Sequence, residues 1–383
     1  MTMPSSHASG AWRFLGASAT VLGLIVHAGA AHGQANPYRR VAVLQAPADV
    51  VQIVPADVFA KGQVAGLTQV KTGETTRYYF DGLRIVAAKE AVRRSDATIW
   101  RADGVAITLP ALARGVDARV WSMNSSGVAA GESKTYLDRT NSVAVVWRDG
   151  KVVDLGAGAR SSARHINESG LVLGRRALTS SVLSDGEFFV GKDKATLKWL
   201  KPLPPGANSL FCVGLTDAGQ VVCRTFGTEG GVSRTKAHVW SNGVFSEIVS
   251  PEGGEVLAMA VSPSGIVAGY VNMPGGGTRG FTWQAGQWRW LPDPPLPAPV
   301  LWSVYDVNDR GEVLLYGYTM YGYNGTTFLW NGLNHVPLND LVVDSAPGET
   351  IGSSRLGPRG ELLVNFQWKV DGALRFKDAV YAP

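Results

Sequence analysis

The sequence contains few of the residues that build metal centres and nucleophilic active sites. Its 383 residues include only two cysteines and six histidines. No H-x-x-x-H pair, Gly-x-Ser-x-Gly elbow or glycine-rich phosphate loop occurs. Because these motifs are missing, the sequence predicts neither a metal site nor a cofactor.

Also missing are an excess of one charge sign and any long apolar run beyond the N-terminus. The 36 basic and 31 acidic residues leave a formal net charge of +5, and the basic residues are scattered along the chain. A nucleic-acid-binding protein concentrates them on one face or stripe. We therefore expect no nucleic-acid partner. We expect no membrane span either, because that requires about 20 apolar residues in a row. A monomer is expected.

The first 33 residues have the features of a secretory signal peptide. Arg13 precedes an apolar run, Phe14–Val26, which is followed by alanine-rich residues. A membrane anchor is the alternative, but the run is short and is interrupted by glycines. We expect export to the periplasm or out of the cell, with residues 38–383 forming one mature domain.

One turn recurs seven times along the chain. Each copy ends in a glycine followed by a short apolar run, and successive glycines lie 43 to 65 residues apart. The copies are Phe59–Gly62, Asn124–Gly127, Asn167–Gly170, Thr216–Gly219, Ser262–Gly265, Asn308–Gly311 and Gly357–Gly360. Glycine tolerates the positive φ that closes such a turn. A period of about 40–50 residues indicates repeated supersecondary units.

One unit shows how each repeat divides into four short strands. Val120–Met123 and Val128–Ala130 flank the repeated turn, whereas Val143–Trp147 and Lys151–Leu155 flank a second turn. Four antiparallel strands in about 40–50 residues form one blade of a β-propeller. The sequence therefore predicts an all-β fold built of such blades.

The two ends of the mature chain indicate how the ring closes. The last unit stops after its third strand, Asp378–Tyr381, and Arg40–Leu44 resembles a fourth strand that no third strand precedes. Pairing these segments completes one blade and leaves no unpaired sheet edge. Seven turns and one shared blade predict a seven-bladed β-propeller of four-stranded antiparallel blades. Eight blades are the alternative.

The first unit, residues 51–110, is irregular. It contains two candidate hairpins, Arg77–Val86 and Ala97–Leu109. One forms the outer pair of the blade and the other is an insertion. The spacing favours the first as the blade's own pair, whereas the position of Trp100 favours the second, so the sequence leaves both open.

A large apolar residue ends the third strand in most units. These residues are Trp147, Val190, Trp240, Trp283, Trp330 and Tyr381. Such a series can stack a ligand or pack adjacent blades. We favour packing, because an apolar residue at one fixed position per blade is what joins neighbouring sheets.

Two segments, Ala163–Gly174 (ARHINESGLVLG) and Ala237–Trp240 (AHVW), follow a known pattern. The pattern is an alanine, an Ile-Asn-x-x-Gly turn, Val-Val-Gly, then Ala-Phe-x-Trp. In this the chain resembles the HAF-repeat family of secreted bacterial proteins over its whole mature length. The resemblance implies a propeller-like fold and secretion. It implies no general biochemical function.

The variable connections between strands are expected to share one face of the ring, where functional residues tend to lie. Four tyrosines lie among glycines in one of them: Tyr316, Tyr318, Tyr321 and Tyr323. A tyrosine ring with its hydroxyl group suits the recognition of sugars or peptides, although the loop can also simply pack on itself. Trp302 and Trp368 are further candidates for ligand binding, with a plug between strands as the alternative for Trp302.

Catalysis has little support in the sequence. Once the signal peptide is removed, only His165, His238 and His335 remain, at positions that the repeat keeps apart. Asp306, Asp293 and Glu349 lie where a propeller can collect carboxylates. We predict a secreted binding or scaffold module for a polysaccharide or peptide; an extracellular propeller-type hydrolase or lyase acting on polysaccharide is the alternative. Carboxylates gathered at one channel mouth would favour the enzyme.

The two cysteines, Cys212 and Cys223, flank the turn Thr216–Gly219. A two-residue loop places them directly opposite each other. A three-residue loop with a glycine bulge suits the Thr-x-x-Gly sequence better, but it shifts the cysteines by one position and so to opposite faces. An exported compartment permits oxidation. We predict a disulfide between them.

Overall fold

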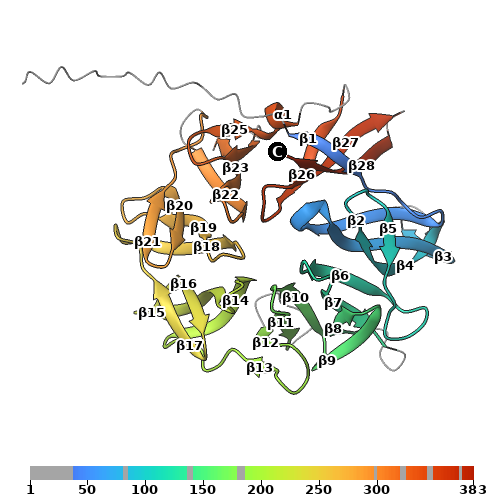
Figure 1. Ribbon diagram of the computed structural model, residues 1–383, viewed down its shortest axis with the longest axis horizontal. Coiled ribbons are helices and arrows are strands. Elements are labelled where there is room, and N and C mark those ends of the chain that lie inside the picture. Colours follow the sequence, from blue (N-terminus) through green and yellow to red (C-terminus); the bar gives the residue numbers. More distant parts are fainter. Residues whose placement is uncertain are drawn as a thin grey trace, which may run out of the picture. The chain divides into compact units, whose positions relative to one another are not determined.

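Seven four-stranded antiparallel sheets form a ring in the computed structural model of the chain (Figure 1). This confirms the seven-bladed β-propeller and not the eight-bladed alternative. The structure describes residues 38–80, 85–135, 141–178, 186–296, 300–319, 325–342, 348–370 and 373–383. The signal peptide expected at residues 1–33 lies outside the described residues and stays a prediction.

Each blade has four strands, which are arranged side by side from the centre of the ring to its outside. Blade 1 contains β2 (Val50–Val58), β3 (Val64–Phe80), β4 (Ile85–Trp100) and β5 (Ala106–Thr108); blade 2 contains β6 (Ala118–Met123), β7 (Ala129–Lys134), β8 (Ser142–Arg148) and β9 (Lys151–Ala159). Blade 3 contains β10 (Ser161–Ile166), β11 (Val172–Ala177), β12 (Gly186–Gly191) and β13 (Lys198–Trp199); blade 4 contains β14 (Ala207–Leu215), β15 (Val221–Glu229), β16 (Val232–Ser241) and β17 (Val244–Ile248).

Blade 5 contains β18 (Glu255–Val261), β19 (Val267–Asn272), β20 (Thr278–Gln284) and β21 (Gln287–Trp290); blade 6 contains β22 (Val300–Val307), β23 (Val313–Thr319), β24 (Thr326–Trp330) and β25 (His335–Pro337). Blade 7 contains β26 (Thr350–Leu356), β27 (Leu362–Val370), β28 (Ala373–Ala382) and, from the other end of the chain, β1 (Arg39–Val43). Two short helical segments, η1 (Ala60–Gly62) and α1 (Leu338–Leu341), lie between strands.

The ring is closed by the N-terminal strand, as predicted. In the register of β1 and β28, Arg40 lies opposite Tyr381 and Val43 opposite Ala379. The Leu44 amide donates to the Asp378 carbonyl at 3.0 Å, which extends the ladder by one bond. The last blade therefore gains a fourth strand, and its third strand is not left as an open edge.

The repeated turns have the geometry that their glycines indicate. In the turn of blade 2, the Gly127 amide donates to the Asn124 carbonyl at 3.0 Å, and Asn124 donates to the Val128 carbonyl at 3.0 Å. Gly127 has φ +82°, a backbone conformation that costs a side-chain-bearing residue energy. The turn glycines of the other six blades also have positive φ. The loop thus has three residues in each repeat.

Neighbouring turns are joined by a belt of hydrogen bonds around the channel. The Asn124 side-chain amide donates to the Asn167 carbonyl at 3.2 Å, and that of Asn167 donates to the Thr216 carbonyl at 3.0 Å. The amide of Glu168 donates to Asp217 Oδ1 at 3.0 Å. The asparagines of the turns therefore hold one blade to the next, in addition to shaping their own turns. We call this side of the ring, which carries the β-turns, the turn face, and the opposite side the loop face.

The third-strand residues pack blade against blade, as predicted. Trp147 and Trp330 are each 2% exposed and Tyr381 is fully buried, whereas Trp283 is half-buried against the core of blade 5. Trp100 takes the same position in blade 1 and is 1% exposed. Replacing a buried tryptophan of this kind by alanine costs about 3–5 kcal/mol.

The irregular first unit is one blade with an extended hairpin. Strands β3 and β4 pair from Val64 opposite Trp100 to Phe80 opposite Ile85, with one shift of register between Lys71 and Gly73. Residues 77–80 and 85–86, the described parts of the segment Arg77–Val86, thus extend this hairpin, and β4 with β5 forms the outer pair within Ala97–Leu109.

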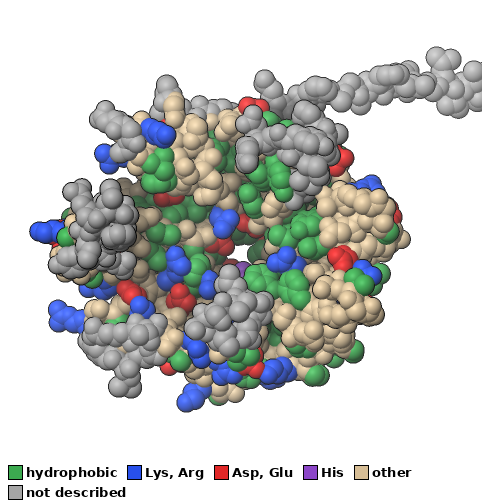
Figure 2. Space-filling model, turned by 180° about the vertical axis from the view of Figure 1, so that it is seen from behind, with side chains coloured by type: hydrophobic (Ala, Val, Ile, Leu, Met, Phe, Trp, Pro, Cys, Tyr) green, Lys and Arg blue, Asp and Glu red, His purple; other side chains and the backbone are tan. Residues whose placement is uncertain are grey.

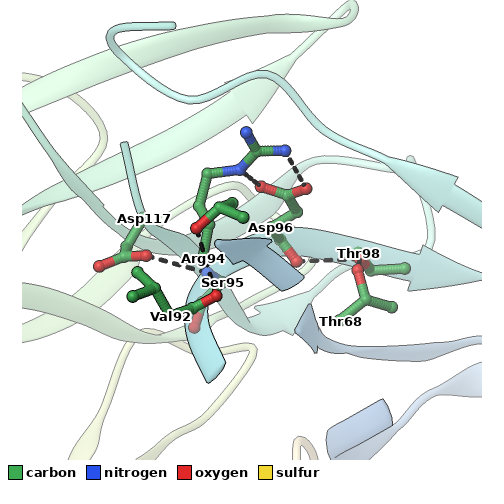
Figure 3. Close-up of polar contacts among 8 residues, drawn as sticks. Thr68, Val92, Arg94, Ser95, Asp96, Thr98 and Asp117 are labelled. Carbon is green, nitrogen blue, oxygen red and sulfur yellow. Dashed lines mark hydrogen bonds and ion pairs between the residues drawn. The ribbon is translucent and has the colours of Figure 1, made fainter. Parts of the chain in front are cut away.

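Polar contacts fasten the hairpin where it leaves the blade (Figure 3). Arg94 forms two hydrogen bonds to Asp96, at 2.6 and 2.8 Å. The Ser95 amide donates to Asp117 Oδ1, just before β6, at 2.9 Å. The base of the extension is therefore attached to blade 2 as well as to its own blade.

Candidate binding surface on the loop face

The innermost strands share a β-bulge that places side chains at the channel. In six blades the register shifts at the residue six positions before the turn glycine. These residues are Ala56, Trp121, Arg164, Val213, Met259 and Tyr305. A bulge redirects side chains and often lies beside a functional site. The bulged residues, with their neighbours on the second strand of each blade, are therefore candidates for ligand binding.

In blade 6 the bulge brings three tyrosines together. The ring of Tyr305 is stacked on that of Tyr316, with centroids 6.2 Å apart and planes at 20°. Tyr316 in turn lies 5.7 Å from Tyr318, at 32°. Tyr305 is 42% exposed, so the series offers an aromatic surface to solvent. Gly325 leaves room for the Tyr316 ring, because a Cβ there would overlap it.

The structure describes some of the predicted aromatic residues and not others. Tyr316 and Tyr318 lie on β23 and belong to the stack. Trp302 lies on β22, with its backbone opposite Gly317. Tyr321 and Tyr323 lie outside the described residues. Tyr305 was not predicted from the sequence, although its place six residues before a turn glycine is the position of the bulge.

Trp368 lies in a groove of about 810 Å³ between blades 7 and 1. Strands β1, β2, β26, β27 and β28 contribute to the walls. Phe376, 56% exposed, adds a second aromatic ring. Asn365 donates to Asp378 at 2.9 Å, and both line the groove. A groove of this size with aromatic and amide groups is typical of a ligand site.

The stack and the groove lie on adjacent blades. Burial raises the pKa of Tyr305, and the guanidinium group of Arg355, on the inner strand of blade 7, opposes that shift. Ser353, two residues earlier on the same strand, lines the groove. The inner strand of blade 7 therefore carries residues close to both the stack and the groove.

Two carboxylates face the channel nearer the turn face. Asp57 of blade 1 and Asp306 of blade 6 line a cavity of about 130 Å³ that also touches His165. Burial raises the pKa of Asp306 to about 6; burial and the nearby Asp306 carboxylate raise that of Asp57 to about 8. The two carboxyl groups therefore titrate together, above the usual range of an aspartate.

Backbone donors occupy both oxygens of Asp306. Oδ1 accepts from the Val307 amide at 3.0 Å and Oδ2 from the Leu356 amide at 3.2 Å. Because Leu356 belongs to blade 7, Asp306 joins blades 6 and 7. These two hydrogen bonds oppose the rise in the pKa of Asp306 and give its side chain a structural role.

The three histidines in the described part of the chain remain apart. Burial lowers the pKa of His165 to about 4. His238 contacts Thr225 at 3.3 Å, and His335 contacts the Pro292 carbonyl at 2.7 Å. Within the described ranges, no three His, Cys, Asp or Glu side chains are grouped to hold a metal ion. Among the same residues, no helix has the length and apolar character needed to cross a membrane.

No protein-family model and no curated protein matches the chain. Solved structures similar to it include an acylaminoacyl peptidase from Pyrococcus horikoshii (11% identity, TM-score 0.46, 82% of this chain and 50% of that one). Others are a fucose-specific lectin from Aleuria aurantia (11%, TM-score 0.35, 68% and 93%) and a gluconolactonase from Xanthomonas campestris (15%, TM-score 0.33, 69% and 90%). Similarities this remote identify no function. The HAF-repeat resemblance stays a prediction.

Proposed function

We propose that this propeller is an exported binding module that holds an extended polysaccharide on its loop face, across blades 6, 7 and 1. The observation that carries the proposal is the stack of Tyr305, Tyr316 and Tyr318. Sugar rings have apolar faces that lie flat on aromatic rings, and the tyrosine hydroxyl groups add hydrogen bonds at the edge.

The neighbouring groove supports an extended ligand. Trp368 and Phe376 supply further aromatic surface, and Asn365 supplies an amide. Gln52, on β2, is exposed at the same groove and can donate or accept a hydrogen bond. A peptide can bind to the same groups, so peptides are tested in the same experiment.

A glycan array, with a peptide library beside it, tests the proposal. We expect the protein to retain polysaccharides. In the variant Tyr305→Ala/Tyr318→Ala, the loss of two stacked rings at about 0.5–1.5 kcal/mol each weakens binding by about 5- to 150-fold. Trp290→Ala, which removes a half-buried ring from the outer strand of blade 5, is the matched control and leaves affinity unchanged.

Two results would contradict the proposal. One is retention of peptides but no glycan. The other is equal affinity of the tyrosine variant and the wild type, when both have the same near-ultraviolet circular dichroism spectrum.

A second candidate function, hydrolysis of a polysaccharide, is favoured by Asp57 and Asp306. Two carboxyl groups with separated pKa values are what general acid and base catalysis requires. In this scheme Asp57 protonates the leaving glycosidic oxygen and Asp306 takes a proton from the attacking water. The backbone donors on Asp306 make binding the better supported function. Release of reducing ends by the wild type, abolished in Asp57→Asn, would establish the enzyme instead.

A further inference from the structure

Blades 2 and 3 carry an arginine–tryptophan cluster on the inner strands. The guanidinium carbon of Arg119 lies 4.1 Å from the ring centroid of Trp121, and that of Arg164 lies 3.9 Å from the same centroid. Trp121 and Arg164 are the bulged residues of their strands, β6 and β10. All three side chains are half-buried, so part of each remains accessible.

The cluster contains more positive than negative charge. Burial lowers the pKa of Arg119 and of Arg164, while Glu132 opposes the shift for both. Arg119 and Arg175 lower the pKa of Arg164 further. Three guanidinium groups, those of Arg119, Arg164 and Arg175, therefore lie near one carboxylate, that of Glu132. The arginine side chains are partly buried, so their charges are only partly solvated.

Several donors in the cluster have no acceptor. Arg119 Nε and Trp121 Nε1 are buried, and within the described part of the chain neither forms a hydrogen bond. A buried donor without a partner costs about 1–3 kcal/mol, which an incoming acceptor recovers. In blade 4, Arg224 repeats the pattern: its Nε is buried without a partner in the described residues, and its guanidinium carbon lies 5.1 Å from the Phe211 ring centroid.

Packing alone does not account for this arrangement. Some of the other described arginines have carboxylate partners: Arg94 pairs with Asp96, Arg279 with Glu252 and Arg310 with Glu312. Arg176, Arg279 and Arg289 also lie over tryptophan rings, but the cluster places two guanidinium groups over one ring. A guanidinium group is planar, so one that lies over a ring can keep its edge free for two-point recognition of a carboxylate or a sulfate.

Basic side chains lie around the central opening of the face seen in Figure 2, together with acidic ones. Arg175 lies opposite Ser162 and Arg224 opposite Phe211, so the two arginines hold equivalent positions on the second strands of blades 3 and 4. The positive charge thus lies on the first and second strands of blades 2 to 4. A chain that carries repeated anionic groups can meet several of them.

We propose that Arg119, Trp121 and Arg164 form a binding site for the anionic groups of an acidic polysaccharide, namely uronate carboxylates or sulfate esters. The inference rests on the proposed polysaccharide-binding function and names its ligand class. The aromatic surface of blades 6 and 7 then holds sugar rings, and the arginines select chains that carry negative charge.

Titration with defined polymers tests the site. The probes are polygalacturonate for carboxylate, dextran sulfate for sulfate and dextran as the neutral reference, each measured by calorimetry at two salt concentrations. We expect an acidic polymer to bind more tightly than dextran and to lose affinity as salt is added, because salt screens partly exposed charges. The preference between the two acidic polymers identifies the anionic group.

The variant Arg119→Gln/Arg164→Gln is expected to weaken binding of the acidic polymer by about tenfold to hundredfold and to flatten its salt dependence. Arg114→Gln/Arg359→Gln, which removes two exposed arginines, carries the same charge change and is the matched control. Arg119→Gln alone replaces the double variant if the latter does not fold, with a smaller loss expected.

The outcomes separate this inference from the proposed function. If the arginine variant and its control bind the acidic polymer equally, while Tyr305→Ala/Tyr318→Ala binds it weakly, the anion site is wrong and polysaccharide binding stands. If no polymer binds, free galacturonate and inorganic sulfate serve as probes of thermal stability. A rise in melting temperature that the arginine variant lacks then supports the anion site, and the absence of a rise overturns it.

Discussion

Cys212 and Cys223 lie directly opposite each other in β14 and β15 and are joined by a disulfide, although the turn between them shifts the strands by one residue. The three-residue loop places Leu215 opposite Val221. A bulge at Val213 then restores the register before the cysteines are reached. The same bulge recurs in five other blades, so a feature of the repeat allows this bridge.

The disulfide can be tested by alkylation of the protein under non-reducing conditions, followed by measurement of its intact mass. We expect no alkylated thiol. Reduction should lower the free energy of unfolding by about 3 kcal/mol, because the bridge closes a short loop in the unfolded chain. Cys212→Ser/Cys223→Ser is the control, since its stability should not respond to reductant. Two alkylated thiols would contradict the bridge.

Deleting residues 38–45 should destabilise the ring. The deletion removes the ladder between β1 and β28 and the Gln45 carbonyl that accepts from Trp100 Nε1 at 3.0 Å. We expect a loss of about 3 kcal/mol or more, since buried apolar surface and a sheet edge become exposed. Thermal unfolding measures it, with the exposed substitution Arg39→Ala as control. An unchanged melting temperature would rule out closure by this strand.

Asp57→Asn should make the protein more stable at alkaline pH. The folded-state pKa of Asp57 is raised to about 8 from 3.8, so the native state binds a proton that the unfolded state has lost. The contribution of Asp57 to the free energy of unfolding is therefore fully present below about pH 4, and it is lost as the pH rises through 8. Asparagine stays neutral, and its oxygen can still accept from the Val58 amide.

Melting temperatures of the wild type and Asp57→Asn at pH 4, 6 and 8.5 check this expectation. The difference should favour the variant increasingly toward pH 8.5. His165 acts in the opposite sense between about pH 4 and 6.5, because its folded pKa is lowered, but it is common to both proteins and cancels in the difference. A difference that does not vary with pH would contradict the assignment.

Asn167→Ala should weaken the contact between blades 3 and 4. The side chain of Asn167 is 4% exposed, donates to the Thr216 carbonyl and accepts from the Leu171 amide at 2.9 Å. Removing it leaves buried groups without partners, at about 1–3 kcal/mol. Chemical denaturation measures the loss, and Ser169→Ala, an exposed residue of the same turn, is the control. Equal stability of the two variants would show that the belt contributes nothing.

Sequence reasoning reached the blade count and the closure because both depend on local signals. A turn glycine with a positive φ and the apolar run after it identify a hairpin wherever they occur, and Gly127 and its equivalents are such glycines. The first unit was left open because the length of a hairpin is not locally encoded. The β3–β4 ladder continues past Arg77 because residues of the two strands that are distant in sequence pair with each other.

The candidate sites were predicted in part. Tyr316 and Tyr318 stand out in the sequence because four tyrosines lie close together among glycines. Tyr305 does not, since it is separated from Tyr316 by a turn and lies at a bulge that no single repeat reveals. Arg119, Trp121 and Arg164 were missed for the same reason: the residues of one site come from different blades.

The sequence by itself thus determined the repeat, the seven-fold ring and the pairing of its ends, because each is specified by turns and strands a few residues long. Only the tertiary structure decided which side chains meet: Tyr305 with Tyr316, Trp121 with Arg164, and Asp57 with Asp306. The last pair lies 249 residues apart in the chain. Such contacts depend on the register of the inner strands, which the bulges shift by one residue, and on the packing that brings one blade against another.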